Sequence, residues 1–197
     1  MRLGAARTRG PPAITWAVAA VQRARLVFTT RSGYAARMHP TDSGARGREF
    51  PAIDPTLRQT IMDTFNVNNP FFPGHCGFKV VDVRTGYSRL ETENRTELSN
   101  PVGVMHGGAS FGMADTAVAV ALFSLYGFGN ALLTIEMNIN YLEPIFPGTV
   151  TAEAFVLRHS RRSAYAEVDI WSFGKLAARA STTYMIKPVA EMRPPKA

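Results

Sequence analysis

The stretch 109–128 most constrains what this chain can fold into, because almost every side chain in it is apolar. A helix that is apolar on all sides is normally buried in a protein core. Asp115 is the only charged residue in the stretch. An ionised carboxylate in such a helix is costly unless it is paired, hydrogen-bonded or directed at a cavity. We therefore predict a long core helix in which Asp115 has either a structural or a catalytic role.

Two glycines, Gly107 and Gly108, directly precede this helix. The N–H groups of a first helical turn have no partner within the helix, and the helix dipole places partial positive charge there. Such an end can bind an oxyanion, and residues without a Cβ let a substrate carbonyl come close to the backbone. The alternative is a tight turn leading into the helix, with His106 as a hydrogen-bonded loop histidine.

The spacing between Gly107 and Asp115 predicts an assembly. Asp115 follows Gly107 by eight residues, which corresponds to roughly 12 Å along a helix axis and about 80° around it. A carbonyl bound at Gly107 is therefore too far from the carboxylate of the same helix. If the two act together, Asp115 must come from a second, antiparallel copy of the helix, which predicts a two-fold homodimer with paired sites at the interface.

The remaining pattern predicts an antiparallel sheet. Strict alternation in 133–141 indicates a half-buried strand with one apolar face, made of Leu133, Ile135, Met137, Ile139 and Tyr141. We expect a short amphipathic helix at 55–66 and further strands at 78–83, 87–93, 148–158, 163–171 and 176–186. This order describes an α+β fold, in which the sheet curls around one long central helix.

Several of these residues together carry a family resemblance. Asn100, the His106-Gly107-Gly108 triplet and Asp115 resemble, in type and spacing, the hotdog-fold acyl-CoA thioesterases of the PaaI-like group, within the 4-hydroxybenzoyl-CoA thioesterase superfamily. The match continues through 134–141 and Pro147-Gly148 and covers about residues 75–187. The resemblance implies a hotdog fold, a homodimer or a dimer of dimers, and an acyl-CoA substrate, and no cofactor is expected.

The resemblance also implies roles for single residues. The Gly107 N–H would polarise the thioester carbonyl, and Asp115 of the partner subunit would act as base or nucleophile. Asn100 would orient the carboxylate or water, although it could instead only cap its own turn. Thr134 would supply a hydroxyl that holds the water, but it lies one residue further from Asp115 than expected. His106 would position the loop or the thioester, and Gly108 would help to bind the substrate.

Three arginines, Arg158, Arg161 and Arg162, fall in the turn between two expected strands. Guanidinium groups offer paired donors suited to phosphate oxygens, so these residues could bind the phosphates of coenzyme A. A solvated cluster of hairpin charges is an equal alternative.

Two other functions fit the same fold. A protein that binds acyl-CoA without hydrolysing it is one, although Asp115 argues against it. An enoyl-CoA hydratase is the other, but the acid and histidine of the hydratase pattern are replaced by Leu98 and Gly103.

The net charge of +7 belongs to the N-terminal part of the chain. Residues 1–37 contain seven arginines and no acidic residue, so the rest is balanced and nucleic-acid binding finds no support. We predict a disordered or removable extension over 1–49, a thioesterase domain over 50–187 and a loose tail over 188–197. The extension resembles a mitochondrial transit peptide, but we favour Met38 as the true start of a compact protein.

Cellular location is predicted from two further features. The apolar run 13–21 is too short to span a membrane, and the arginines after it argue against a secretory signal. Cys76 is the only cysteine, which indicates a reducing compartment. The cytoplasm is therefore expected, or the mitochondrial matrix if the extension is a transit peptide. The histidines have no metal-ligand spacing with Cys76, so we expect no metal site.

Overall fold

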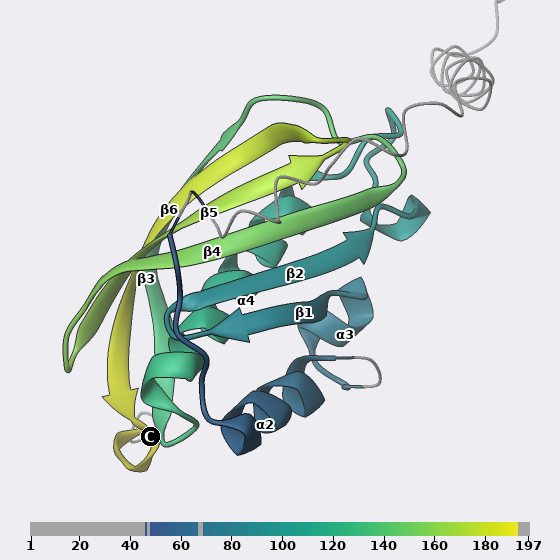
Figure 1. The fold of residues 1–197 in the computed structure, drawn as a ribbon. Helices are drawn as coiled ribbons and strands as arrows, with labels where there is room; N and C mark the ends of the chain where they lie inside the picture. The colour runs from purple at the N-terminus through teal and green to yellow at the C-terminus, as the bar shows by residue number, and fades with distance from the viewer. Residues whose placement is uncertain (1–45, 47, 67–68, 193–197) are drawn as a thin grey trace, which may run out of the picture.

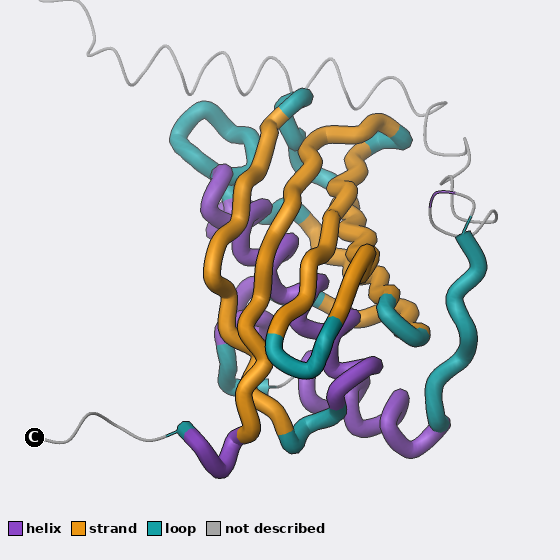
Figure 2. Tube along the Cα trace, turned by 90° about the vertical axis from the view of Figure 1, so that its left-hand side faces the viewer, coloured by secondary structure: helices purple, strands orange, loops and turns teal. Residues whose placement is uncertain are grey.

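The computed structural model describes residues 46, 48–66 and 69–192 of the chain. One antiparallel sheet, in the order β1-β2-β4-β5-β6-β3, curves around the long helix α4 (Figures 1 and 2). Its strands are β1 (Lys79–Arg84), β2 (Tyr87–Glu93), β3 (Asn130–Tyr141), β4 (Thr149–His159), β5 (Ser163–Ser172) and β6 (Lys175–Pro188). This is the hotdog arrangement expected from the sequence.

Helix α4 (Gly107–Tyr126) is the core of the fold and packs against strands β1 to β5. Its length and apolar character would also suit a membrane span, but here these properties belong to a core helix whose middle is buried by the sheet. It begins two residues earlier than expected, because His106 caps it. It ends before Gly127, which has a φ of 62° and whose N–H bonds to the Phe123 carbonyl oxygen.

Strand β3 carries an irregularity that corrects the expected alternation. The register with β6 shifts between Thr134 and Glu136, so the strand bulges at Ile135. After this bulge Met137 and Ile139 pack against the core as predicted, but before it the core contact is Leu132. The expectation for Leu133 and Ile135 was therefore wrong, and Ile135 is 62% exposed. Thr134 lies before the bulge on the same face as Leu132 and is directed toward Asp115 of α4, and the bulge moves the side chains after it so that Met137 and Ile139 also face inward.

Two short helices cover the end of the sheet formed by β1. Helix α2 (Pro55–Phe65) is the expected amphipathic helix and is capped by Asp54, whose side chain accepts the Leu57 N–H at 3.0 Å. The prolines and glycine of the stretch 69–74 predict a break in the chain, but one turn of helix, α3 (Phe72–Cys76), forms there and ends at Gly77, which has a φ of 69°. Local composition does not show whether a single helical turn fits into such a stretch.

The structure describes part of the expected N-terminal extension and part of the expected C-terminal tail. Residues 1–45 and 47 of the predicted extension lie outside them. The segment from Arg48 to Pro51 crosses the sheet on the side away from α4 (Figure 1). The Phe50 ring stacks on Tyr87 at 5.1 Å between centroids. At the other end, the expected tail begins with the 3₁₀ helix η4 (Val189–Glu191).

Arg46 lies over the buried Asp169 and the partly exposed Glu167 on this outer face of the sheet. It donates to both oxygens of Asp169, at 2.8 and 2.9 Å, and also pairs with Glu167. Burial alone would raise the pKa of Asp169, but hydrogen bonds from Arg46 and Arg179 hold it below its ordinary value. Arg46 thus contacts the sheet although it lies four residues before the boundary expected at residue 50.

We expect Arg46→Ala to lower the free energy of unfolding by about 1–2 kcal/mol at neutral pH, because Asp169 keeps only Arg179 as a charged partner. The folded pKa of Asp169 is depressed, so its stabilisation is present above the unfolded pKa and is lost as pH falls through the folded pKa. The deficit should therefore shrink in acid. Denaturant unfolding of the wild type and the variant at neutral and at acidic pH measures this difference, and Arg48→Ala, a change at an exposed arginine, is the control. Equal free energies of unfolding for the wild type and Arg46→Ala at neutral pH would contradict the prediction.

Candidate active site

Asn100 organises the loop that leads into α4. Its backbone N–H donates to the Val104 carbonyl oxygen at 2.8 Å, and its Oδ1 accepts the Val102 N–H at 3.0 Å. The turn is completed by Gly103, whose φ of 89° suits a residue without a side chain. These contacts match the turn-capping alternative for Asn100. The amide Nδ2 has no hydrogen bond to any part of the chain that the structure describes.

His106 separates the roles of the two glycines. Its Nδ1 accepts the Gly108 N–H at 2.9 Å, which makes His106 the N-cap of the helix. The Gly108 N–H is thus occupied while this bond holds. Within residues 46, 48–66 and 69–192, no acceptor lies on the Gly107 N–H. Of the two glycines, Gly107 is therefore the one that can donate to an incoming carbonyl oxygen.

A cleft of about 430 Å³ lies beside Gly107. Its lining residues come from the helix start and from the segment after β3: Val104, Met105, Gly107, Ser110, Tyr141, Leu142, Glu143, Pro144 and Ile145. The Tyr141 hydroxyl donates to the Gly107 carbonyl oxygen at 2.8 Å. A Cβ on Gly107 would lie 3.1 Å from that hydroxyl oxygen, so glycine lets Tyr141 pack closely here. Tyr141 was expected only as a strand residue, and its contribution to the site was missed.

Asp115 is held from two neighbouring strands. The Thr134 hydroxyl donates to Asp115 Oδ1 at 2.7 Å, and the Tyr184 hydroxyl approaches the same oxygen at 2.5 Å. Thr134 and Tyr184 are directly paired across β3 and β6, immediately before the bulge. The bulge at Ile135 lets Thr134 share the inward face of β3 with Met137 and Ile139, which follow it. Tyr184 was missed, although a buried tyrosine normally requires a hydrogen-bond partner and so points to a polar group nearby.

Burial and charge keep Tyr184 protonated. Its side chain is 2% exposed. Burial raises the pKa of Tyr184, and the neighbouring Asp115 carboxylate raises it further. The hydroxyl therefore keeps its proton and can donate to Asp115 at neutral pH.

The carboxylate and the cleft are separate within one chain. Asp115 does not line the cleft beside Gly107. This agrees with the separation of roughly 12 Å along the axis for eight helical residues. The arrangement provides an unpaired N–H donor in one place and an oriented carboxylate in another, and a single protomer does not bring the two together.

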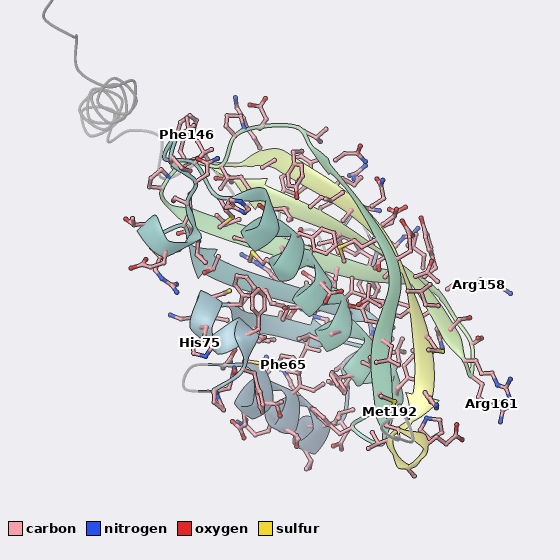
Figure 3. The ribbon with its side chains drawn as sticks, turned by 180° about the vertical axis from the view of Figure 1, so that it is seen from behind. Phe65, His75, Phe146, Arg158, Arg161 and Met192 are labelled. Carbon is pink, nitrogen blue, oxygen red and sulfur yellow. The ribbon has the colours of Figure 1, made fainter. Side chains whose placement is uncertain are left out.

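The arginine cluster lies at the opposite end of the molecule. Arg158 and Arg161 point outward at the β4–β5 hairpin, far from Phe146, which follows the cleft residue Ile145 (Figure 3). The Tyr126 hydroxyl, at the end of α4, donates to the Ser160 carbonyl oxygen at 2.6 Å and anchors this hairpin. A pocket of about 160 Å³ beside it is lined by Arg158, His159, Ser160, Ser163, Ala164, Tyr165 and Thr183.

Comparisons with known proteins identify the family of the chain. The family model of the thioesterase superfamily matches residues 102–177. An esterase-like protein of Archaeoglobus fulgidus is 31% identical over 107 residues, which cover 53% of this chain and 68% of that protein. The chain belongs to the thioesterase superfamily. The proofreading thioesterase EntH of Klebsiella pneumoniae is 26% identical over 97 residues, which cover 49% of this chain and 71% of EntH.

Solved structures of similar proteins share the fold. A mutant of the phenylacetic acid degradation protein PaaI from Thermus thermophilus has a TM-score of 0.54 and 29% identity, covering 58% of this chain and 96% of PaaI. A conserved protein of Pseudomonas aeruginosa has a TM-score of 0.59 and 29% identity, covering 65% and 98% of the two chains. This superfamily member is a thioester hydrolase of the PaaI-like group.

The hydratase alternative has no support in the loop. Leu98, which replaces the acid of the hydratase pattern, is buried at 7% exposure. Gly103, which replaces the histidine, has the left-handed φ noted above and no side chain to transfer a proton. The loop before α4 thus offers an N–H donor and a turn, but neither group of the hydratase pair.

Proposed function

We propose that this thioesterase hydrolyses acyl-CoA to a free acid and coenzyme A in a homodimer with two shared sites. The single observation that carries the proposal is the Gly107 N–H, which has no acceptor among the described residues and borders a cleft that Asp115 of the same chain does not line. The cleft has one acidic lining residue, the exposed Glu143, whereas the carboxylate of Asp115 is held in place by two hydroxyl groups and can reach the cleft only from the partner subunit.

Gly107 would act as the electrophile activator. Its N–H donates to the thioester oxygen, and this bond strengthens as negative charge develops there in the transition state. Tyr141 and His106 hold this end of the helix from either side. The loss of one such donor typically raises a barrier by roughly 3–4 kcal/mol.

Asp115 of the partner subunit would supply the second half of the reaction. As a base, it takes a proton from the water that attacks the carbonyl carbon. As a nucleophile, it forms an anhydride that water then cleaves. In both routes the C–S bond breaks, the sulfur leaves as the coenzyme A thiolate and is protonated, and the acyl group leaves as a carboxylic acid.

The exposed edge of β3 supports the proposed homodimer. β3 is the last strand of the sheet, so one side of its backbone is not paired with another strand of the sheet. Ile135 on this strand is 62% exposed, and Leu142 directly after it is 55% exposed. An apolar strand edge next to a half-finished site suits a second copy of the same chain. A homodimer and a homotetramer would both place a second copy of the chain at this edge.

The same antiparallel arrangement gives the arginine hairpin a role. Within one protomer it lies roughly 28 Å from Gly107 along the axis of α4. If Asp115 of each helix faces Gly107 of the other, the end of the partner's α4 lies only roughly 16 Å beyond Gly107. The partner subunit's hairpin would then be near the extended tail of a bound acyl-CoA, where its phosphates lie. Arg158, Arg161 and Arg162 are all exposed and available for phosphate contacts.

We expect the double change Arg161→Ala and Arg162→Ala to raise KM for acyl-CoA by about 5- to 20-fold, with little change in kcat, because charge-assisted bonds to phosphate are lost. Steady-state kinetics measure both constants. An acyl thioester of N-acetylcysteamine, which has no phosphate, is the control, and its KM should not change. If the wild type and the double variant have the same KM for acyl-CoA, the arginines do not bind its phosphates and form only a solvated charge cluster.

The direct test of the proposed function is release of free thiol from a panel of short-chain, medium-chain and aromatic acyl-CoAs. Sedimentation of the same preparation gives its oligomeric state. Hydrolysis by a dimer or larger assembly supports the proposal, and efficient hydrolysis by an isolated protomer contradicts it. Tight acyl-CoA binding without any hydrolysis would instead support a binding protein.

A further inference from the structure

Two donors converge on one oxygen of Asp115. Thr134 and Tyr184 both place their hydroxyl groups within 2.7 Å of Oδ1. Among the described residues, no hydrogen bond falls on Oδ2. The two oxygens of this carboxylate therefore differ, since one is fixed by the sheet and the other is free.

The Tyr184 hydroxyl has a single proton to donate. It lies 2.5 Å from Oδ1 and 3.0 Å from the backbone carbonyl oxygen of Asp115. The shorter contact to a charged acceptor is the stronger one. The second contact holds the hydroxyl against the Asp115 backbone. Tyr184 therefore restrains both the carboxylate of Asp115 and the helix backbone that carries it.

Burial separates the roles of the two donors. Thr134 is exposed, whereas Tyr184 is 2% exposed between α4 and the sheet. A substrate cannot contact Tyr184 without displacing core residues. Any effect of Tyr184 on a reaction must therefore pass through Asp115.

We propose that Tyr184 is a positioning residue that, together with Thr134, fixes Asp115 through Oδ1 and leaves Oδ2 as the reacting oxygen. This inference depends on the proposed function, because it assigns the acting atom of the same carboxylate. A carboxylate clamped on one side cannot rotate about its terminal bond, so Oδ2 keeps a constant direction toward the partner subunit. The pairing of Thr134 with Tyr184 across β3 and β6 places both hydroxyl groups at the same oxygen, and the bulge after Thr134 lets Met137 and Ile139 also face the core.

Tyr184→Phe removes the donor and keeps the ring. We expect kcat to fall by about 10- to 100-fold, because misplacing a reacting group by about 1 Å has an effect of this size. KM should not change, since Tyr184 does not reach the substrate. The additional change Thr134→Val, which frees Oδ1 completely, should lower kcat below that of either single variant.

Tyr87→Phe is the matched control. Tyr87 is also buried, its hydroxyl also donates to a carboxylate, Glu153 Oε1 at 2.9 Å, and its pKa is also raised, by burial and by Glu153. It lies on the other face of the sheet, so its removal tests the general cost of deleting a buried tyrosine hydroxyl. We expect kcat and KM of this variant to equal those of the wild type.

Three outcomes separate this inference from the proposed function. If Asp115→Asn abolishes hydrolysis and Tyr184→Phe keeps the wild-type kcat, the positioning role is wrong and the proposed function stands. If Asp115→Asn keeps its activity, the proposed function loses its acid and the inference falls with it. Crystal structures of the wild type and Tyr184→Phe give a test without activity, because an unchanged Asp115 carboxylate in both would overturn the positioning role.

Discussion

Asp115→Asn should lower kcat for acyl-CoA hydrolysis by roughly 10³- to 10⁴-fold, the size of effect seen when a catalytic carboxylate is removed. The amide is neither a base nor a nucleophile, yet it has the same shape. Its carbonyl oxygen can still accept the hydroxyl protons of Thr134 and Tyr184, so the contacts to β3 and β6 remain. Thiol release measures kcat, and thermal unfolding establishes that the variant is folded.

Two further variants sharpen this result. Asp63→Asn, on the exposed face of α2, removes a carboxylate that only pairs with Gln59 and should keep full activity. Asp115→Glu keeps the charge but displaces it by one methylene, and its activity should lie between those of the wild type and Asp115→Asn. Wild-type turnover in Asp115→Asn would show that the carboxylate is structural, the alternative that its position in an apolar helix also allowed.

The parts of the fold that follow from periodic patterns were predicted with small errors. The central helix was expected at 109–128 and is Gly107–Tyr126, and the strands lie where alternation placed them. The bulge in β3 was not predictable in this way, because it depends on the pairing with β6 rather than on β3 alone. Helix α3 was missed because proline and glycine at its ends are equally typical of a loop and of a short capped helix.

The candidate site was only partly predictable for a related reason. Gly107 and Asp115 could be identified because both lie on or beside one conspicuous helix. Tyr184 follows Asp115 by 69 residues, and only the folded sheet brings the two together. Tyr141 likewise reaches Gly107 from 34 residues away. The structure shows where these residues lie, and the catalytic and binding roles of Gly107, Asp115, Thr134, Asn100, His106, Gly108 and the arginines remain predictions.

Mixing two inactive variants should restore activity if the site is shared between subunits. Asp115→Asn removes the acid. Gly107→Val places a branched side chain against Tyr141, where a Cβ alone would already lie 3.1 Å from the hydroxyl oxygen, and obstructs the carbonyl site. In a mixed dimer one site carries both defects and the other carries neither. Refolding an equal mixture should therefore recover about one quarter of the wild-type kcat per protomer, because about half of the dimers are mixed and each has one intact site.

The recovered fraction distinguishes the two possible architectures. If Gly107 and Asp115 of the same chain acted together, every site in every mixture would contain one defect, and the mixed sample would be as inactive as its components. Mixing Asp115→Asn with Thr134→Val/Tyr184→Phe is the matched control, since both lesions lie on the carboxylate side. A mixed dimer of these two variants has no intact carboxylate side, so its activity should not exceed the average of the two separate proteins. Recovery only with Gly107→Val would thus require that the N–H donor and the acid come from different chains.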